Sequence, residues 1–158
     1  LAAADKYIKP AIRYQGCAYD SGVDFLLPNR YFTLWSTSDS RIRSTLETFA
    51  SAGEQLENLA ISEEDLRGYI SSAYAQALPP SGMLNGRMLF LRRRLFGIST
   101  DHINKMIMDI RNSSLKDQRT AAKLIHKILQ NSPAAVVGNE KLIEENKDLF
   151  DEVMKLHS

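Results

Sequence analysis

The sequence is poor in thiols and metal ligands. It has one cysteine, Cys17, and three histidines that lie far apart along the chain, His102, His126 and His157. A single cysteine excludes an internal disulfide framework, and such dispersed histidines leave little from which to build a zinc site. We therefore expect these residues to hold no metal and no cofactor.

Long apolar runs and an excess of one charge are also missing. No stretch approaches the ~18 apolar residues of a membrane span, and no basic segment leads into an apolar one at the N-terminus. Lys and Arg number 20 and Asp and Glu 19, which leaves a net charge of +1. Such a balance gives no overall field that recruits nucleic acid or anionic membrane. We expect a soluble protein with neither of these partners, and the cytoplasm as its compartment.

The composition that remains is that of one globular domain. The chain has 158 residues, of which 44% are apolar and 25% charged, and these fractions are near globular averages. We predict a single domain over residues 1–158. The chain begins at Leu1 rather than Met, and its first residues already have a helical pattern, so we expect a fragment of a larger chain.

The order of apolar periods predicts an α+β fold, with a helix-rich layer packed on a small antiparallel sheet. A short or bent helix ends near Gly16, and a hairpin over Cys17–Thr37 turns at Pro28–Arg30. Ala134–Val137 is a candidate buried strand, and the remainder to Ser158 is amphipathic. Because two or three strands make a poor sheet, we expect it to be completed by preceding sequence or by a second chain, including self-association through its edge.

Helix signals fill the region between the hairpin and the last strand. Capping boxes, an N-terminal cap, and a glycine suited to a left-handed helix end mark the boundaries, at Ser62 with Asp65, Ser114 with Asp117, Ser99 and Gly97. One predicted apolar stripe, which includes Met88, Leu91 and Leu95, would place Arg87 and Arg92–Arg94 on the solvent face. The alternative for these arginines is a patch for phosphate or an acidic partner.

Catalytic motifs are absent. Neither H-E-x-x-H nor H-x-x-E-H occurs, and there is no G-x-S-x-G, P-loop or dinucleotide fingerprint. We predict no catalytic residue in this chain and interpret His102 and His126 as ordinary surface or boundary histidines. Cys17 is interpreted as a small buried hydrophobe, with a reactive thiol as the alternative.

The segment from Ala11 to Gly22 carries the candidate binding site. Arg13 at a helix end and Tyr19 at the start of a strand, with Gly16 between them, bring a guanidinium and a phenol towards one place from two elements. Together they could hold a peptide carbonyl or a developing oxyanion. The alternative is a structural arginine and an ordinary sheet tyrosine.

This segment resembles the I-R-x-x-G-G-A-Y-G motif in the C-terminal half of insulinase-like zinc metallopeptidases of the pitrilysin and presequence protease type. Cys17 and Asp20 stand where the motif has glycines. Further similarities follow in the family's order over nearly the whole chain, at Gly22–Phe25, Trp35–Ser40, Ser62–Leu66, Leu95–Ser99 and Val136–Glu140.

The resemblance implies a substrate-binding and chamber-forming C-terminal domain of a zinc metalloendopeptidase, without the metal site. It implies that zinc lies in an N-terminal catalytic half of the same protein, that short unstructured peptides are the substrates, and that Arg13 and Tyr19 bind their backbone. The fragment alone is then not expected to be active. The alternative is a catalytically inactive homologous scaffold that acts in assembly or peptide binding.

Overall fold

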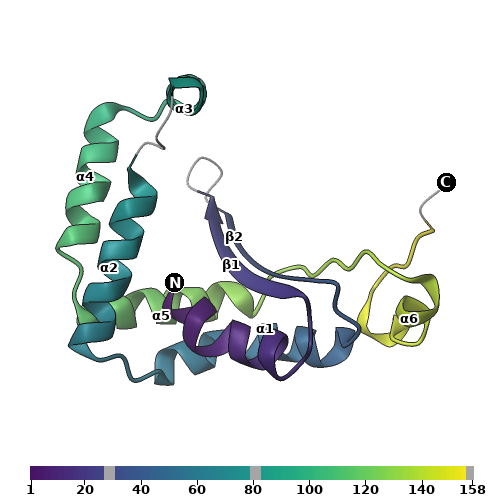
Figure 1. Cartoon of the computed structure of the whole chain (residues 1–158). Helices are drawn as coiled ribbons and strands as arrows, with labels where there is room; N and C mark the ends of the chain where they lie inside the picture. The colour runs from purple at the N-terminus through teal and green to yellow at the C-terminus, as the bar shows by residue number, and fades with distance from the viewer. Residues whose placement is uncertain (27–30, 79–82, 156–158) are drawn as a thin grey trace.

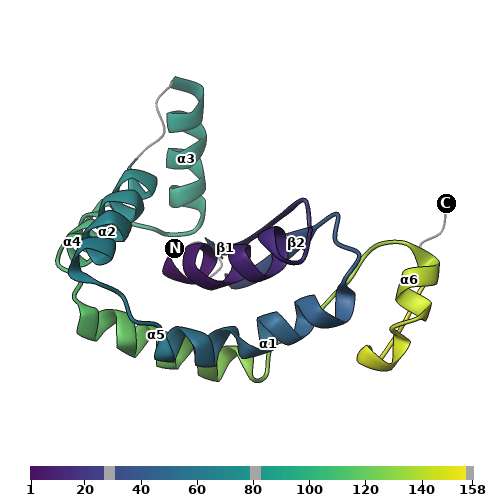
Figure 2. The same cartoon turned by 60° about the horizontal axis from the view of Figure 1, so that its bottom comes forward.

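The computed structural model describes residues 1–26, 31–78 and 83–155. A two-stranded hairpin and the N-terminal helix lie above a base of two long helices, and three further helices form an arm that rises from one end of that base (Figures 1 and 2). The C-terminal elements lie at the opposite end of the base, far from the arm. The hairpin is therefore flanked by two projections.

The N-terminal helix η1 (Ala4–Tyr14) is wider than an α-helix. The amide of Gln15 donates to the carbonyl of Pro10, five residues earlier, over 3.1 Å. Pro10 lies inside the helix, where its ring and missing N–H disfavour regular α-helical bonding. Ile8 and Ile12 are both buried, as expected for residues four apart on one face. The predicted bent helix ending before Gly16 is confirmed.

The hairpin is formed by β1 (Asp20–Leu26) and β2 (Tyr31–Thr37). The strands are antiparallel, with a register that runs from Asp20 opposite Thr37 to Leu26 opposite Tyr31. Val23 and Leu34 face each other and pack against the buried cluster of Ile8, Ile12, Ala18 and Ala52. The predicted hairpin is confirmed, and its predicted turn residues lie outside the described residues.

The base consists of α1 (Ile42–Asn58) packed against α5 (Leu115–Leu129). The two helices approach closely where Gly53 lies against His126, and Ala52 and Ala122 are buried nearby. Nδ1 of His126 lies 2.6 Å from a carboxylate oxygen of Glu57. This partly buried side-chain contact agrees with the interpretation of His126 as a boundary residue.

The arm consists of α2 (Glu63–Ala77), α3 (Met83–Leu95) and α4 (Thr100–Arg111). The predicted capping signals are confirmed: both capping boxes form, Ser99 accepts from the amide of His102, and Gly97 has φ 65°. The predicted buried stripe of α3 is wrong. Leu91 is 49% and Leu95 76% exposed, because the described part of the chain packs no helix over that face.

The C-terminal region differs most from the prediction. Ala134–Val137 is extended but forms no strand in the part of the chain that the structure describes, and only Val136 of the four is partly buried. The amphipathic remainder is not one helix: it contains the short α6 (Glu140–Glu144) and η2 (Lys147–Leu149), followed by irregular chain to residue 155. The predicted strand has no neighbour among the described residues with which to share backbone hydrogen bonds.

The predicted α+β class is confirmed, with helices packed on a small antiparallel sheet. The packing is open, since the accessible surface is 11766 Å². A compact monomer of 17.8 kDa exposes about 8,000 Å². Among the described residues no helix is both long enough and apolar enough to cross a membrane.

Candidate functional site

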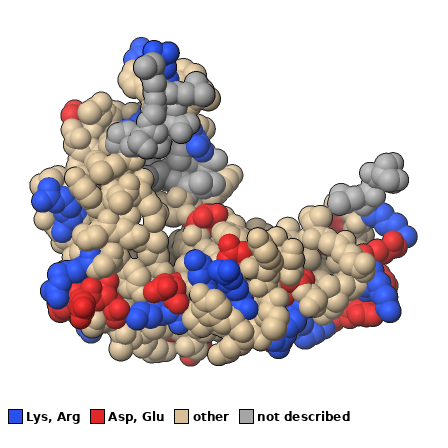
Figure 3. Space-filling model, in the orientation of Figure 1, with Lys and Arg blue, Asp and Glu red and all other residues tan. Residues whose placement is uncertain are grey.

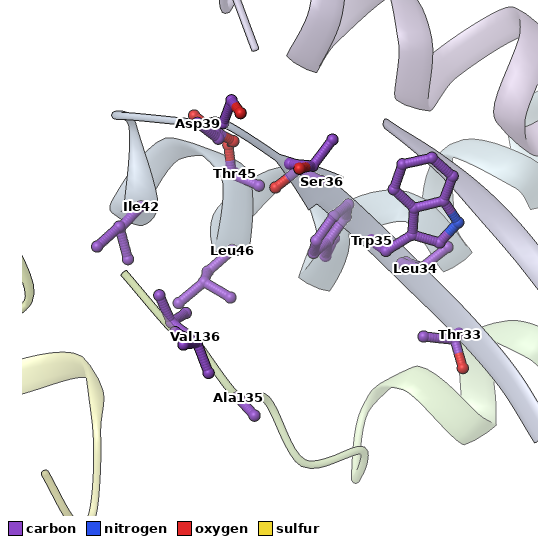
Figure 4. Close-up of a pocket in the computed structure, with 14 residues that line it drawn as sticks. Thr33, Leu34, Trp35, Ser36, Asp39, Ile42, Thr45, Leu46, Ala135 and Val136 are labelled. Carbon is purple, nitrogen blue, oxygen red and sulfur yellow. The ribbon is translucent and has the colours of Figure 1, made fainter. Parts of the chain in front are cut away.

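A groove separates the edge of β2 from the extended segment Ala135–Val137. Its volume is about 360 Å³. Figure 4 shows β2 along one side and this segment along the other, with side chains of α1 between them. The α1 residues that line it are Ile42, Thr45, Leu46 and Phe49.

The inner wall is β2, whose second edge faces the groove. β1 pairs with β2 on one side only, because the sheet has two strands in the described chain. In an antiparallel pair, alternate residues direct their N–H and C=O groups away from the partner strand. β2 therefore presents a row of backbone donors and acceptors to the groove.

The outer wall is held at both ends. Before the outer wall, α5 packs on α1. After the wall, Nη2 of Arg43 on α1 donates to both carboxylate oxygens of Asp148 over 2.7 Å. This contact holds the pKa of Asp148 below its ordinary value, because the guanidinium stabilises the carboxylate. Between these ends the side chains of Val136 and Leu46 point towards one another, whereas Val137 is 80% exposed (Figure 4).

A polar corner closes one end of the groove. The carboxylate of Asp39 accepts from the amide of Arg41 over 2.8 Å and from the hydroxyl of Thr45 over 2.6 Å. The guanidinium of Arg41 reaches back to the carbonyl of Gln15. These bonds fix the end of β2 to the first turn of α1 and use both oxygens of Asp39, the one carboxylate in the lining.

Trp35 is held tightly beside the groove. A Cβ at Gly22, its cross-strand partner, would lie 2.9 Å from Cζ2 of the indole. The Trp35 Nε1 and the Ser21 hydroxyl are both buried with no hydrogen-bond partner among the described residues. Unpaired buried polar groups are rare and costly, so these two atoms mark the hairpin as incompletely satisfied.

The structure places the predicted pair, Arg13 and Tyr19, at the corner between η1 and β1. Nη1 of Arg13 lies 3.7 Å from a carboxylate oxygen of Asp20, and its guanidinium lies 5.9 Å from the ring centre of Tyr14. Tyr19 is 76% exposed, and its amide donates to the carbonyl of Thr37, a groove-lining residue. No hydrogen bond joins the two predicted side chains to each other in the described structure.

Cys17 corrects another interpretation. It is exposed rather than buried, and its φ of 62° lies in the left-handed region. The turn that carries η1 into β1 requires this conformation, because the amides of Cys17 and Ala18 bond back to the carbonyls of Arg13 and Ile12. Elsewhere in the described chain no group of three or more His, Cys, Asp or Glu side chains is arranged to hold a metal ion.

The groove is suited to binding a polypeptide backbone rather than to acid–base chemistry. Its lining supplies a strand edge, the hydroxyls of Thr33 and Ser36, and an apolar floor. The sequence did not predict that Leu46 and Val136 would lie opposite one another. The available signal was the apolar run at Ala134–Val137, which predicted a strand and therefore a neighbouring strand in a sheet.

Comparisons with known proteins show similarity to a curated protein that is much longer than this chain. The chain is 26% identical over 148 residues to Protein HypA of Clostridium perfringens (strain 13 / Type A). The alignment covers 93% of this chain and 15% of the relative, so the chain spans about a seventh of the length of the relative that it matches. No family model matches the chain. No solved structure matches it either.

These comparisons correct the family assignment. No family model supports an insulinase-like peptidase, and the relative bears the name Protein HypA rather than that of a peptidase. The insulinase-like assignment is therefore corrected. The predicted role as a substrate-binding, chamber-forming domain of a zinc metallopeptidase is corrected with it, as is the alternative of an inactive homologous scaffold.

The predicted partners are corrected as well. The N-terminal catalytic half and the short unstructured peptide substrates rested on the withdrawn resemblance. The prediction of self-association through an open sheet edge is corrected too, because the free edge of β2 is one wall of a groove whose other wall is Ala135–Val137, and not an open surface (Figure 4). An incoming strand has to enter between two walls rather than pair with a free surface.

Proposed function

We propose that this chain is an interaction domain that accepts one extended strand in the groove between β2 and Ala135–Val137. We propose further that this strand comes from a longer polypeptide that contains the chain, because the relative is much longer than these 158 residues. The observation that carries the proposal is the groove itself, in which a strand edge and an extended segment face each other across an apolar floor.

The chemistry of the groove favours an extended occupant. A strand laid along β2 would satisfy the row of backbone groups that β1 leaves unpaired. Its inward side chains would cover Leu46 and Phe49 on the floor, and its outward side chains would face solvent. The expected occupant is therefore a segment of alternating apolar and polar residues.

The open packing favours an occupant from beyond these residues. The accessible surface of 11766 Å² is well above the value of about 8,000 Å² for a compact monomer of this mass. The relative is much longer than this chain, which supports the view that further polypeptide covers part of that surface.

Arg13 and Tyr19 keep a predicted binding role in this proposal. Tyr19 is exposed, and its backbone amide donates to the carbonyl of Thr37, which lines one end of the groove. Arg13 lies at the same corner through its contact with Asp20. The cytoplasmic location remains a prediction from the sequence.

Photo-crosslinking in the longer polypeptide tests the proposal. Val137→p-benzoylphenylalanine places a photoreactive side chain in the groove lining at an exposed position, so folding is preserved. We expect adducts to map by mass spectrometry to one extended segment outside residues 1–158. The matched control, Val153→p-benzoylphenylalanine, is also exposed but lies away from the groove, and should give no adduct with that segment.

Two results would overturn the proposal. One is adducts from position 137 that map only within residues 1–158. The other is an adduct pattern that is the same for positions 137 and 153, which would show contact without a specific occupant of the groove.

A further inference from the structure

A second surface, on the arm, differs from the rest of the molecule in charge and polarity. From Leu66 to Thr100 the sequence has five arginines and no Asp or Glu, in a chain whose net charge is only +1. Four of the five lie on α3, and Figure 3 shows basic side chains near the top of the arm, above a lower region of mixed charge. No ion pair of these four arginines occurs in the described structure.

The same surface exposes large apolar side chains. Those of α3 and the residue that follows it are at least 49% exposed, namely Met88, Phe90, Leu91, Leu95 and Phe96. The arginines face solvent as predicted, with Arg93 partly buried, but Leu91 and Leu95 are exposed beside them rather than buried beneath them. Exposed apolar groups that adjoin unpaired arginines are typical of an interaction surface.

A hollow of about 370 Å³ adjoins this surface at Phe90, between the end of α2, the last turns of α3 and the start of α4. Phe90, Arg93 and Arg94 form one side, and Ile103 and Ile107 of α4 form another. A concavity of this kind takes the anchoring side chain of a partner, with the two guanidinium groups placed to meet carboxylates around it.

We propose that the hollow between α3 and α4 docks an acidic polypeptide segment that carries apolar anchor residues. Charge complementarity selects acidic side chains, because the surface offers only arginines as charged groups along α3. The exposed apolar residues disfavour nucleic acid, whose backbone would leave them uncovered. The concave shape favours a side chain over a flat lipid surface. This site lies on the arm, apart from the strand-accepting groove.

Fluorescence anisotropy with the full chain and a labelled synthetic peptide tests the inference. The probe is an amphipathic helical peptide with Leu on one face and Glu on the others. We expect it to bind, and expect the double variant Arg93→Glu with Arg94→Glu to bind at least about tenfold more weakly, since two attractive contacts become repulsive. Phe90→Ser should also weaken binding, because it removes an exposed apolar wall of the hollow.

The matched control reverses two charges elsewhere. Arg119→Glu with Lys123→Glu changes two exposed residues of α5 and should leave the affinity unchanged, with circular dichroism confirming that every variant is folded. A peptide with Ser in place of Leu, and one with Lys in place of Glu, should both bind poorly. Equal affinity for the two double variants would overturn the inference. Binding to phosphatidylserine-containing vesicles without binding to the Glu–Leu peptide would overturn it too.

Discussion

Gly53 of α1 and His126 of α5 lie so close that a Cβ built on the glycine would be 2.8 Å from the Cβ of His126 and nearer still to its Cα. The backbone of α5 therefore occupies the space of a side chain at position 53. This approach sets the spacing of the two base helices and hence the place where α5 ends and the outer wall of the groove begins.

The first prediction follows from this contact. Gly53→Ala should lower the free energy of unfolding by about 1–3 kcal/mol, the cost of overpacking, because α5 can yield only by moving its backbone. Gly68→Ala is the matched control: a Cβ there meets nothing within 4 Å, and the change should stabilise α2 by about 0.5–1 kcal/mol. Urea denaturation measures both. An unchanged free energy of unfolding in Gly53→Ala would show that α1 and α5 are not in close contact.

The second prediction concerns the turn at Cys17, whose φ is 62°. Cys17→Gly should be neutral or stabilising by up to about 1 kcal/mol, because glycine adopts this conformation without a Cβ clash. Cys17→Val should destabilise by at least about 1 kcal/mol, because a β-branched residue is poorly tolerated there. Thermal unfolding ranks the two variants, and the reverse order would exclude a left-handed turn at this position.

The third prediction concerns acid stability. Hydrogen bonds from Lys6 and Ser62 lower the pKa of Asp65 below its ordinary value of 3.8, and those from Ser114 lower the pKa of Asp117 in the same way. Each of these two carboxylates therefore stabilises the folded state above pH 3.8. This stabilisation is lost as the pH falls through the lowered pKa of the folded state.

Unfolding measured between neutral and acidic pH checks this prediction. Asp65→Asn with Asp117→Asn should be less stable than the parent at neutral pH, and its stability should fall less steeply in acid. Asp151→Asn, which removes an exposed carboxylate with no described hydrogen bond, should follow the parent curve. Identical curves for the double variant and the parent would contradict the assigned bonds.

The capping boxes were predictable from the sequence because both partners lie three residues apart, so local chemistry alone decides them. The hairpin was predictable because its strands are consecutive in the sequence and consist of β-branched and aromatic residues on either side of a turn signal. The exposure of Leu95 was not, because a periodic pattern identifies the apolar face of a helix without saying what covers it. Likewise, Val136 belongs to an apolar run that predicts a strand, yet strand pairing needs a neighbour that is not among the described residues.

The candidate site was predictable only in part. Arg13 and Tyr19 both lie near the short connection between η1 and β1, but Arg13 contacts Asp20 and Tyr14 rather than Tyr19, and their binding role stays a prediction. The groove was not predictable, because its walls are residues 33–39 and 135–137, about a hundred positions apart, brought together by the packing of α1 on α5.

The fourth prediction concerns the outer wall of that groove. Arg43→Ala removes the two bonds to Asp148 that hold the C-terminal elements against α1. Because this ion pair is exposed, global stability should change little, but protease cleavage within residues 131–139 should become faster. Lys141→Ala, which removes an exposed ion pair within α6 to Glu145, is the control and should leave cleavage unchanged. Equal cleavage in both variants would mean that Arg43 does not secure the wall.

The central claim is that β2 receives a strand, and hydrogen exchange at its backbone amides tests this most directly. In the 158-residue chain alone, alternate amides of residues 33–37 should exchange quickly, because they face the empty side of the strand. In the proposed longer polypeptide that supplies the strand, the same amides should be protected, while those bonded to β1 should change little. Equal exchange at residues 33–37 in the two proteins would contradict the account.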